Sequence, residues 1–310
     1  MECRWRRLGL AAGFAALVLV SRGGAQADTS GTIADHMAKG SLNVVLTVSD
    51  MEKAKAFYGG VLGLEPMAPI QFGADSNPVF FPEPTEMIRY QVGSHEIKLI
   101  TSSKPLKLYP GGTRTGIGFR MVNFPIADPE ALFERVEVAG LSKPAITELP
   151  GSNYRFGMLQ DPDGNQVEFH FYEGDGPEGW TDRIHIALTV ADVEKTRAFY
   201  GEILGMEEAG SFPMPGRPET TIYLFRLGET TVKFWSFGPD LPVYSGRHLD
   251  AYGFRYLQYQ VKDIDAVHEF IKARGGTIEL PPTPMNSMPV SLMFVADPDG
   301  IINEFFGLKP

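Results

Sequence analysis

Two side chains in the second half of the chain, His185 and Glu304, are of types that hold divalent metals or transfer protons. Apolar residues alternate through the run RIHIALTV, which predicts a strand with one face on a core and His185 on the other face. The same alternation in later strands puts further polar and aromatic residues on the face of His185. Together they predict one concave pocket, lined by His185, Lys233, Trp235, Tyr256, Gln258, Glu304 and Phe306.

Such a pocket suits either catalysis or binding. As a catalytic site it would use His185, Tyr256 and Glu304, with His185 and Glu304 as metal ligands, although a metal site needs more donors than these two. As a binding site it would hold the ligand through Trp235, Gln258, Phe306 and Lys233. Plainer roles remain open, because a strand histidine often satisfies a neighbour, a tyrosine can simply pack, and a glutamate can end an exposed strand.

A tandem repeat gives the first half of the chain a corresponding face. Residues 43–65 return as residues 185–207 with 13 of 23 positions identical, and the DPDG of 161–164 returns at 297–300. The equivalent face carries Asn43, Lys98, Gly118, Arg120, Glu168 and His170. Of these we expect Lys98, Glu168 and His170 to contact a ligand. The repeat predicts two domains, residues 40–173 and 182–309, joined by a linker at 174–181.

The order of elements is the same in both domains. Each opens with a strand and a helix, for which Asp50 and Asp192 are the expected N-caps and Gly63 and Gly205 the expected left-handed ends. Further strands follow, and a second, similar module ends in the DPDG hairpin. The predicted fold is α+β, with two βαβββ modules per domain forming a cup-shaped mixed sheet and helices on its convex side.

With the phrases AFYGxxLG and DPDGxxxE in this order, the chain resembles the vicinal oxygen chelate superfamily, which includes glyoxalase I, bleomycin-binding proteins and extradiol dioxygenases. The resemblance implies four ligand positions in metal-using members: His or Gln, Glu, His and Glu. The matching residues here are His185, Lys233, Tyr256 and Glu304 in the second domain. In the first domain they are Asn43, Lys98, Gly116 and Glu168.

A lysine therefore replaces a carboxylate in each domain. We expect the ammonium to stand in for a cation, with Lys98 neutralising Glu168 and Lys233 neutralising Glu304; the alternative is that each lysine extends to solvent. No cofactor is expected, and a divalent ion (Zn, Ni, Mn or Fe) is the alternative.

The ends and the charge of the chain predict where it acts. Arginines, a 13-residue apolar run and Ala25-Gln26-Ala27 predict a signal peptide over residues 1–27, followed by a loose lead-in at 28–39. We therefore expect a secreted or periplasmic protein. Its net charge of −10 argues against nucleic acid and anionic membranes as partners, and its one cysteine, Cys3, lies in the signal.

Three functions fit these observations, and all have a small-molecule site or its remnant. The first is a metal-free protein that binds a small organic molecule, mainly in the second domain. The second is a metal-dependent enzyme, glyoxalase-like lyase or dioxygenase, that uses His185 and Glu304. The third is a structural or interaction module. The sequence does not determine the ligand or the oligomeric state.

Overall fold

The structure is a computed structural model that describes residues 31–308 except 74 and 110. The predicted signal peptide and residues 28–30 of the predicted lead-in lie outside the described residues. No helix within the described part of the chain is both long and apolar enough to cross a membrane.

The folded body begins earlier than Gly40. A short helix, α1 (Ile33–His36), leads directly into strand β1 (Met37–Thr47). Ile33 is fully buried, and its amide donates to the carbonyl of Leu204 at 2.8 Å. The prediction that residues up to 39 are loosely held is wrong for this part, because one apolar side chain and one backbone bond suffice to dock a segment too short to show an apolar period.

The repeated strand–helix unit forms as expected in both halves. Helix α2 (Met51–Lys55) continues into the π-helical turn η1 (Ala56–Val61), and α4 (Val193–Arg197) continues into η3 (Ala198–Ile203). The Asp50 carboxylate accepts from the amide of Lys53, as an N-cap should. After η1, Gly63 has a φ of 74°, a conformation that favours glycine. The predicted caps are thus confirmed.

The remaining elements follow the predicted order. In the first half these are β2 (Glu65–Pro66), β3 (Ile70–Phe72), β4 (Thr85–Val92), β5 (His95–Ile100), β6 (Gly118–Pro125), α3 (Pro129–Val138), β7 (Ile146–Glu148), β8 (Tyr154–Gln160) and β9 (Gln166–Tyr172). In the second half these are η2 (Trp180–Asp182), β10 (Ile184–Thr189), β11 (Glu207–Met214), β12 (Arg217–Leu227), β13 (Thr230–Trp235), β14 (Gly253–Val261), α5 (Ile264–Ala273), β15 (Thr277–Pro284), β16 (Val290–Ala296) and β17 (Ile302–Leu308).

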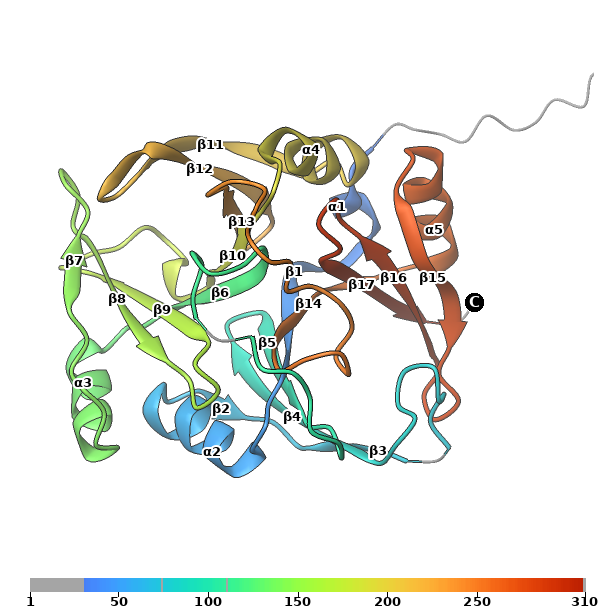
Figure 1. The fold of residues 1–310 in the computed structure, drawn as a ribbon, viewed down its shortest axis with the longest axis horizontal. Coiled ribbons are helices and arrows are strands. Elements are labelled where there is room, and N and C mark those ends of the chain that lie inside the picture. The colour runs from blue at the N-terminus through green and yellow to red at the C-terminus, as the bar shows by residue number, and fades with distance from the viewer. Residues whose placement is uncertain (1–30, 74, 110, 309–310) are drawn as a thin grey trace, which may run out of the picture.

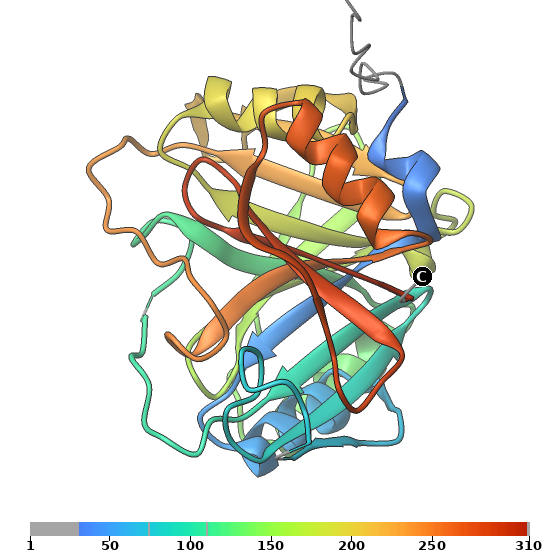
Figure 2. The same ribbon diagram turned by 90° about the vertical axis from the view of Figure 1, so that its right-hand side faces the viewer.

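The strands form two curled sheets, and the helices lie on the outside of the molecule (Figures 1 and 2). The sheet that we call the β14 sheet has the order β15-β16-β17-β14-β1-β5-β4-β2, with β3 also paired to β4. The β10 sheet has the order β11-β12-β13-β10-β6-β9-β8-β7. The α+β fold class with tandem repeats and cup-shaped sheets is confirmed.

Each sheet takes one module from each half of the chain. Strand β1 pairs antiparallel with β14, and β10 pairs antiparallel with β6. Figure 1 shows β1 and β14 side by side at the centre of the molecule. The outer modules, first and fourth, thus share the β14 sheet, whereas the middle modules, second and third, share the β10 sheet. We expected each cup to form within one half, so this exchange changes which side chains meet.

Candidate functional site

The register of the central strands brings four equivalent side chains together in each sheet. In the β14 sheet Asn43 lies opposite Gln258, and Gln258 lies opposite Glu304. Lys98 is the fourth member, on the neighbouring β5. We call this set (Asn43, Lys98, Gln258 and Glu304) the β14 centre.

The β10 sheet repeats the arrangement with other residues. His185 lies opposite Asn123, and Asn123 lies opposite Glu168. Lys233 comes from β13, beside β10. We call this set (His185, Lys233, Asn123 and Glu168) the β10 centre.

A continuous hydrogen-bond network joins the β14 centre. Lys98 Nζ donates to Gln258 Oε1 at 2.6 Å, and Asn43 Nδ2 donates to the same oxygen at 3.2 Å. Gln258 Nε2 in turn donates to Glu304 Oε2 at 2.8 Å. Glu96 lies 3.4 Å from Lys98 and completes the charge balance. The amide of Gln258 thus links the Lys98 ammonium to the Glu304 carboxylate through two hydrogen bonds.

Burial controls the ionisation of this centre. Removal from water raises the pKa of Glu304 to about 7, although Lys98 and the Gln258 hydrogen bond act in the opposite direction. Burial also lowers the pKa of Lys98, opposed chiefly by Glu96 and then by Glu304. The carboxyl of Glu304 therefore exchanges a proton near neutral pH.

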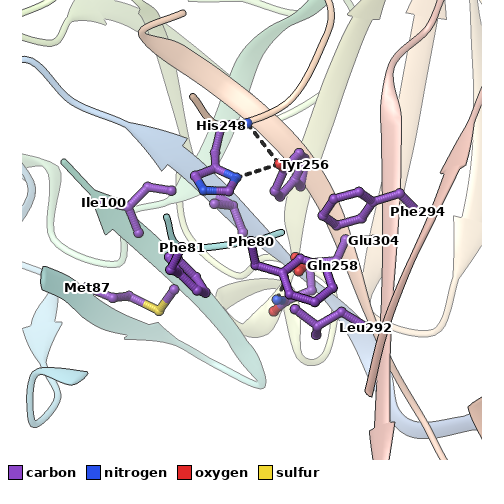
Figure 3. A pocket seen from close by; sticks show the side chains of 11 residues that line it. Phe80, Phe81, Met87, Ile100, His248, Tyr256, Gln258, Leu292, Phe294 and Glu304 are labelled. Carbon is purple, nitrogen blue, oxygen red and sulfur yellow. Dashed lines mark hydrogen bonds between the residues drawn. The ribbon is translucent and has the colours of Figure 1, made fainter. Parts of the chain in front are cut away.

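The cavity above the β14 centre is nearly filled by aromatic side chains. Its volume is about 20 Å³, enough for no more than water. Phe80 and Phe81 come from the loop between β3 and β4, and Phe80 packs edge-on against Phe294 at 5.6 Å between centroids. Figure 3 shows both phenylalanines reaching into the space beside Tyr256 and Gln258.

A buried histidine orients Tyr256 in this cavity. The Tyr256 hydroxyl accepts from the amide of His248 at 2.8 Å and lies 2.7 Å from His248 Nδ1, contacts drawn as dashed lines in Figure 3. Burial lowers the pKa of His248 to about 4, so the ring is neutral at pH 7 and its Nδ1 accepts a hydrogen bond from the hydroxyl. His248 therefore holds the phenol in place, a role close to the plain packing that we considered for Tyr256.

The β10 centre is organised around a direct ion pair. Lys233 Nζ lies 2.6 Å from Glu168 Oε1, and both side chains are buried. Asn123 Nδ2 also donates to Glu168, and Asn123 Oδ1 bonds to Nδ1 of His170. One asparagine thus connects the ion pair to an imidazole.

Three rings stack in a row beside this pair. The ring centroids of Tyr154 and His170 are 5.2 Å apart at 20°, and those of His170 and His185 are 5.2 Å apart at 17°. Burial lowers the pKa of His170 to about 3 and lowers that of His185 well below its ordinary value, with Lys233 adding to both shifts. Both imidazoles are neutral at physiological pH. We call these three rings (Tyr154, His170 and His185) the ring stack.

The ring stack and the β10 centre line a large cavity of about 910 Å³, which we call the β10 cavity. Another part of its wall is apolar, with Trp235, Met121 and Ile222 in one buried cluster. Trp180 comes from η2 in the predicted linker, and its ring centroid lies 5.7 Å from that of His170. A cavity of this size and lining accommodates a small organic molecule.

The single pocket expected from the sequence is divided between the two sheets. His185, Lys233 and Trp235 line the β10 cavity. Tyr256, Gln258 and Glu304 line the small β14 cavity, and Phe306 packs against the core of that sheet. His185 and Glu304 therefore cannot share a metal, and the expectation of a site mainly within the second domain is wrong. The alternation of side chains identified the site face of β5, β9, β10, β13, β14 and β17, but it was wrong for Arg120 on β6, where a bulge shifts the pattern and Met121 and Asn123 take that face. Alternation also says nothing of which strands become neighbours.

The expected lysine–glutamate pairs form with exchanged partners. Lys233 pairs with Glu168, and Lys98 acts on Glu304 through Gln258. Both lysines are only 8% exposed, so the alternative that they extend to solvent is wrong. The exchange follows from the docking of modules between the two halves.

Sequence reasoning missed Asn123 and assigned Gly116 and Tyr256 to its position in the two domains. The signal was present, because residues 118–120 and 253–255 are both Gly-Phe-Arg and align Asn123 with Gln258. Tyr154 was also missed, since its contact with His185 through His170 joins distant parts of the chain. His170 was found and lies in the ring stack.

The donor sets of the two centres do not fit a divalent ion. An ammonium has no lone pair to offer a metal, and the one carboxylate of the β10 centre is already paired with it. The third of the four ligand positions, a histidine in metal-using members, is occupied by the amides Gln258 in the β14 centre and Asn123 in the β10 centre. Within residues 31–308 without 74 and 110, no three His, Cys, Asp or Glu side chains converge as a metal group.

Comparison with known proteins identifies relatives of each half. Lactoylglutathione lyase of Haemophilus influenzae is 29% identical over 130 residues, which are 41% of this chain and 92% of that protein. A probable chloroplastic lactoylglutathione lyase of Arabidopsis thaliana is 26% identical over 126 residues, 38% of this chain and 33% of that protein. The alignment thus spans only a third of the length of this plant relative.

Solved structures match nearly the whole fold. A point mutant of glyoxalase I from Zea mays superimposes with a TM-score of 0.67 at 20% identity, over 88% of this chain and 94% of the maize chain. A putative dioxygenase from Bacillus subtilis gives 0.60 at 16% identity, over 87% and 86%. These likenesses show the fold. Because the sequence profile of the family matches residues 35–169 and 183–305, the chain belongs to the Glyoxalase/Bleomycin resistance protein/Dioxygenase superfamily.

Proposed function

We propose that this protein binds a small aromatic or amphipathic organic molecule in the β10 cavity and does so without a divalent metal. The observation that carries the proposal is the β10 cavity itself, about 910 Å³, with the ring stack on one part of its wall and Trp235 on another. Aromatic walls bind planar or apolar ligands by stacking and by burial of apolar area.

The β10 centre supports the metal-free part of this proposal. Lys233 supplies the positive charge that Glu168 needs at 2.6 Å, so the buried carboxylate is compensated by the protein alone. The relatives named lactoylglutathione lyase each match less than half of this chain. Their activity is therefore a weaker basis for function than the cavity.

The β14 centre is a poorer candidate for ligand binding. Its cavity of about 20 Å³ is closed by Phe80 and Phe81, whereas the β10 cavity is open to a compound of drug-like size. We also propose that residues 1–27 direct the protein out of the cytoplasm, on the evidence of their sequence alone.

Two measurements on the purified protein test the proposal. Elemental analysis should find less than one divalent ion per chain after exposure to Zn²⁺, Ni²⁺ and Mn²⁺ and removal of excess. A thermal-shift screen of aromatic and aliphatic compounds should find stabilising ligands among the aromatic ones, because binding to the folded state raises its stability. Trp235→Ala should weaken those ligands, whereas Val138→Ala, exposed on α3 and outside the cavity lining, should not.

One stoichiometric, tightly held metal would make a metal-dependent enzyme the better interpretation. An absence of stabilising compounds across the screen would favour the structural or interaction module.

A further inference from the structure

The lining of the β10 cavity is positively charged in a protein that is strongly negative. The whole chain carries a net charge of −10. The charged side chains of the cavity are the cations Arg114, Arg183, Arg226 and Lys233 and the anions Glu168 and Glu229. A cavity of this sign in an acidic molecule attracts anions and disfavours cations.

Two of these cations, Arg114 and Arg226, are free to meet a ligand. Lys233 is paired with Glu168, and Arg183 Nε lies 3.1 Å from Glu229. The side chains of Arg114 and Arg226 are exposed and have no hydrogen bond or ion pair with any other described residue, and the sheet register singles out Arg226. An exposed guanidinium is a bidentate donor suited to a carboxylate.

The sheet register places Arg226 within reach of the ring stack. Arg226 on β12 lies opposite Thr231 on β13, and Thr231 lies opposite His185 on β10. Residues opposite one another project from the same face, and two strand spacings amount to about 10 Å. If a ligand stacks an aromatic ring on His185, a substituent on a second, fused ring would therefore lie near the guanidinium of Arg226.

We infer that the ligand of the β10 cavity is a planar aromatic compound with a carboxylate, its ring extending the ring stack at His185 and its carboxylate bound by Arg226. The inference rests on the proposed function and adds to it the chemical class of the ligand. The ring stack supplies a flat neutral surface, and the apolar wall around Trp235 supplies further contact area for the ring system.

Calorimetric titration with three probes tests the inference on the full-length protein. 2-Naphthoate has both features, 2-naphthamide keeps the ring without the charge, and cyclohexanecarboxylate keeps the charge without the aromatic ring. Each is titrated into wild type, Arg226→Gln and Arg217→Gln at low ionic strength. Arg217 lies on the same strand and does not line the cavity, so it is a matched control.

We expect wild type to bind 2-naphthoate about fivefold more tightly than 2-naphthamide, the worth of one exposed charge pair. Cyclohexanecarboxylate should bind more weakly than both. Arg226→Gln should remove the preference for naphthoate and retain naphthamide, while Arg217→Gln should behave as wild type.

Equal binding of naphthoate and naphthamide by wild type would overturn the inference, as would an unchanged preference in Arg226→Gln. Naphthamide binding would in both cases leave the proposed function standing. If neither naphthalene probe binds, the proposed function fails along with the inference.

Discussion

Replacement of Lys233 by glutamate should convert the β10 centre into a divalent-metal site. The substitution removes the ammonium that lies 2.6 Å from Glu168 and adds a second carboxylate beside the imidazole of His185. Two carboxylates and one imidazole are donors that Zn²⁺ or Mn²⁺ accepts, with water completing the coordination.

The magnitude follows from the charges. At about 4 Å and an effective dielectric constant near 20, an ammonium repels a divalent ion by about 8 kcal/mol. Screening and side-chain movement reduce this figure, so we expect Lys233→Glu to bind Zn²⁺ at least about a hundredfold more tightly than wild type, or about 2.7 kcal/mol. Lys233→Gln, which only removes the charge, should fall between the two.

Isothermal titration calorimetry on metal-stripped protein measures these affinities, and the rise in melting temperature with Zn²⁺ gives a second readout. Lys195→Glu is the control for net charge, because Lys195 is exposed on α4, where it pairs with Asp192, and does not line the β10 cavity. Tight one-to-one Zn²⁺ binding by wild type would refute the reasoning. So would a Lys233→Glu affinity no higher than that of Lys195→Glu.

Three further predictions concern stability. Lys233→Met should lower the free energy of unfolding by about 3–5 kcal/mol, because it leaves Glu168 buried and unpaired. The double variant Lys233→Met/Glu168→Leu should recover most of that loss. Urea unfolding measures both, and equal stabilities of the single and double variants would contradict the prediction. Glu304 has a folded-state pKa of about 7, above its unfolded value, so its contribution to stability is fully present at pH 4 and is lost as pH rises through 7. Glu304→Gln should therefore gain stability relative to wild type by about 3 kcal/mol between pH 4 and 8 in denaturant titrations, and parallel pH profiles would show that Glu304 does not titrate as described. Phe80→Ala should cost about 3–5 kcal/mol and enlarge the β14 cavity, which calorimetric melting and binding of 2-naphthamide would detect; a loss below about 1 kcal/mol would mean that Phe80 is not packed as described.

Local features of the chain were readable from the sequence because they depend on neighbours a few residues away. The caps at Asp50 and Asp192 and the left-handed Gly63 and Gly205 required only short-range geometry. Strand alternation put Lys98 and other site residues on the correct face, because successive side chains alternate in any strand. The apolar periodicity predicted the strands and helices, and the repeat predicted that both halves fold alike, since two copies of one module sequence must do so.

The site itself was decided by which modules dock. The pairing of β1 with β14 and of β10 with β6 joins residues more than 60 positions apart, and no local signal distinguishes this pairing from one within each half. This pairing places Lys233 and Glu168 in one sheet, where they form an ion pair, and it places His185 and Glu304 in different sheets. The contrast between a filled cavity and an open one likewise depends on where the loop carrying Phe80 and Phe81 packs. The sequence determined the chemical groups and their faces, and long-range packing determined their partners, because only the folded sheet brings distant strands into register.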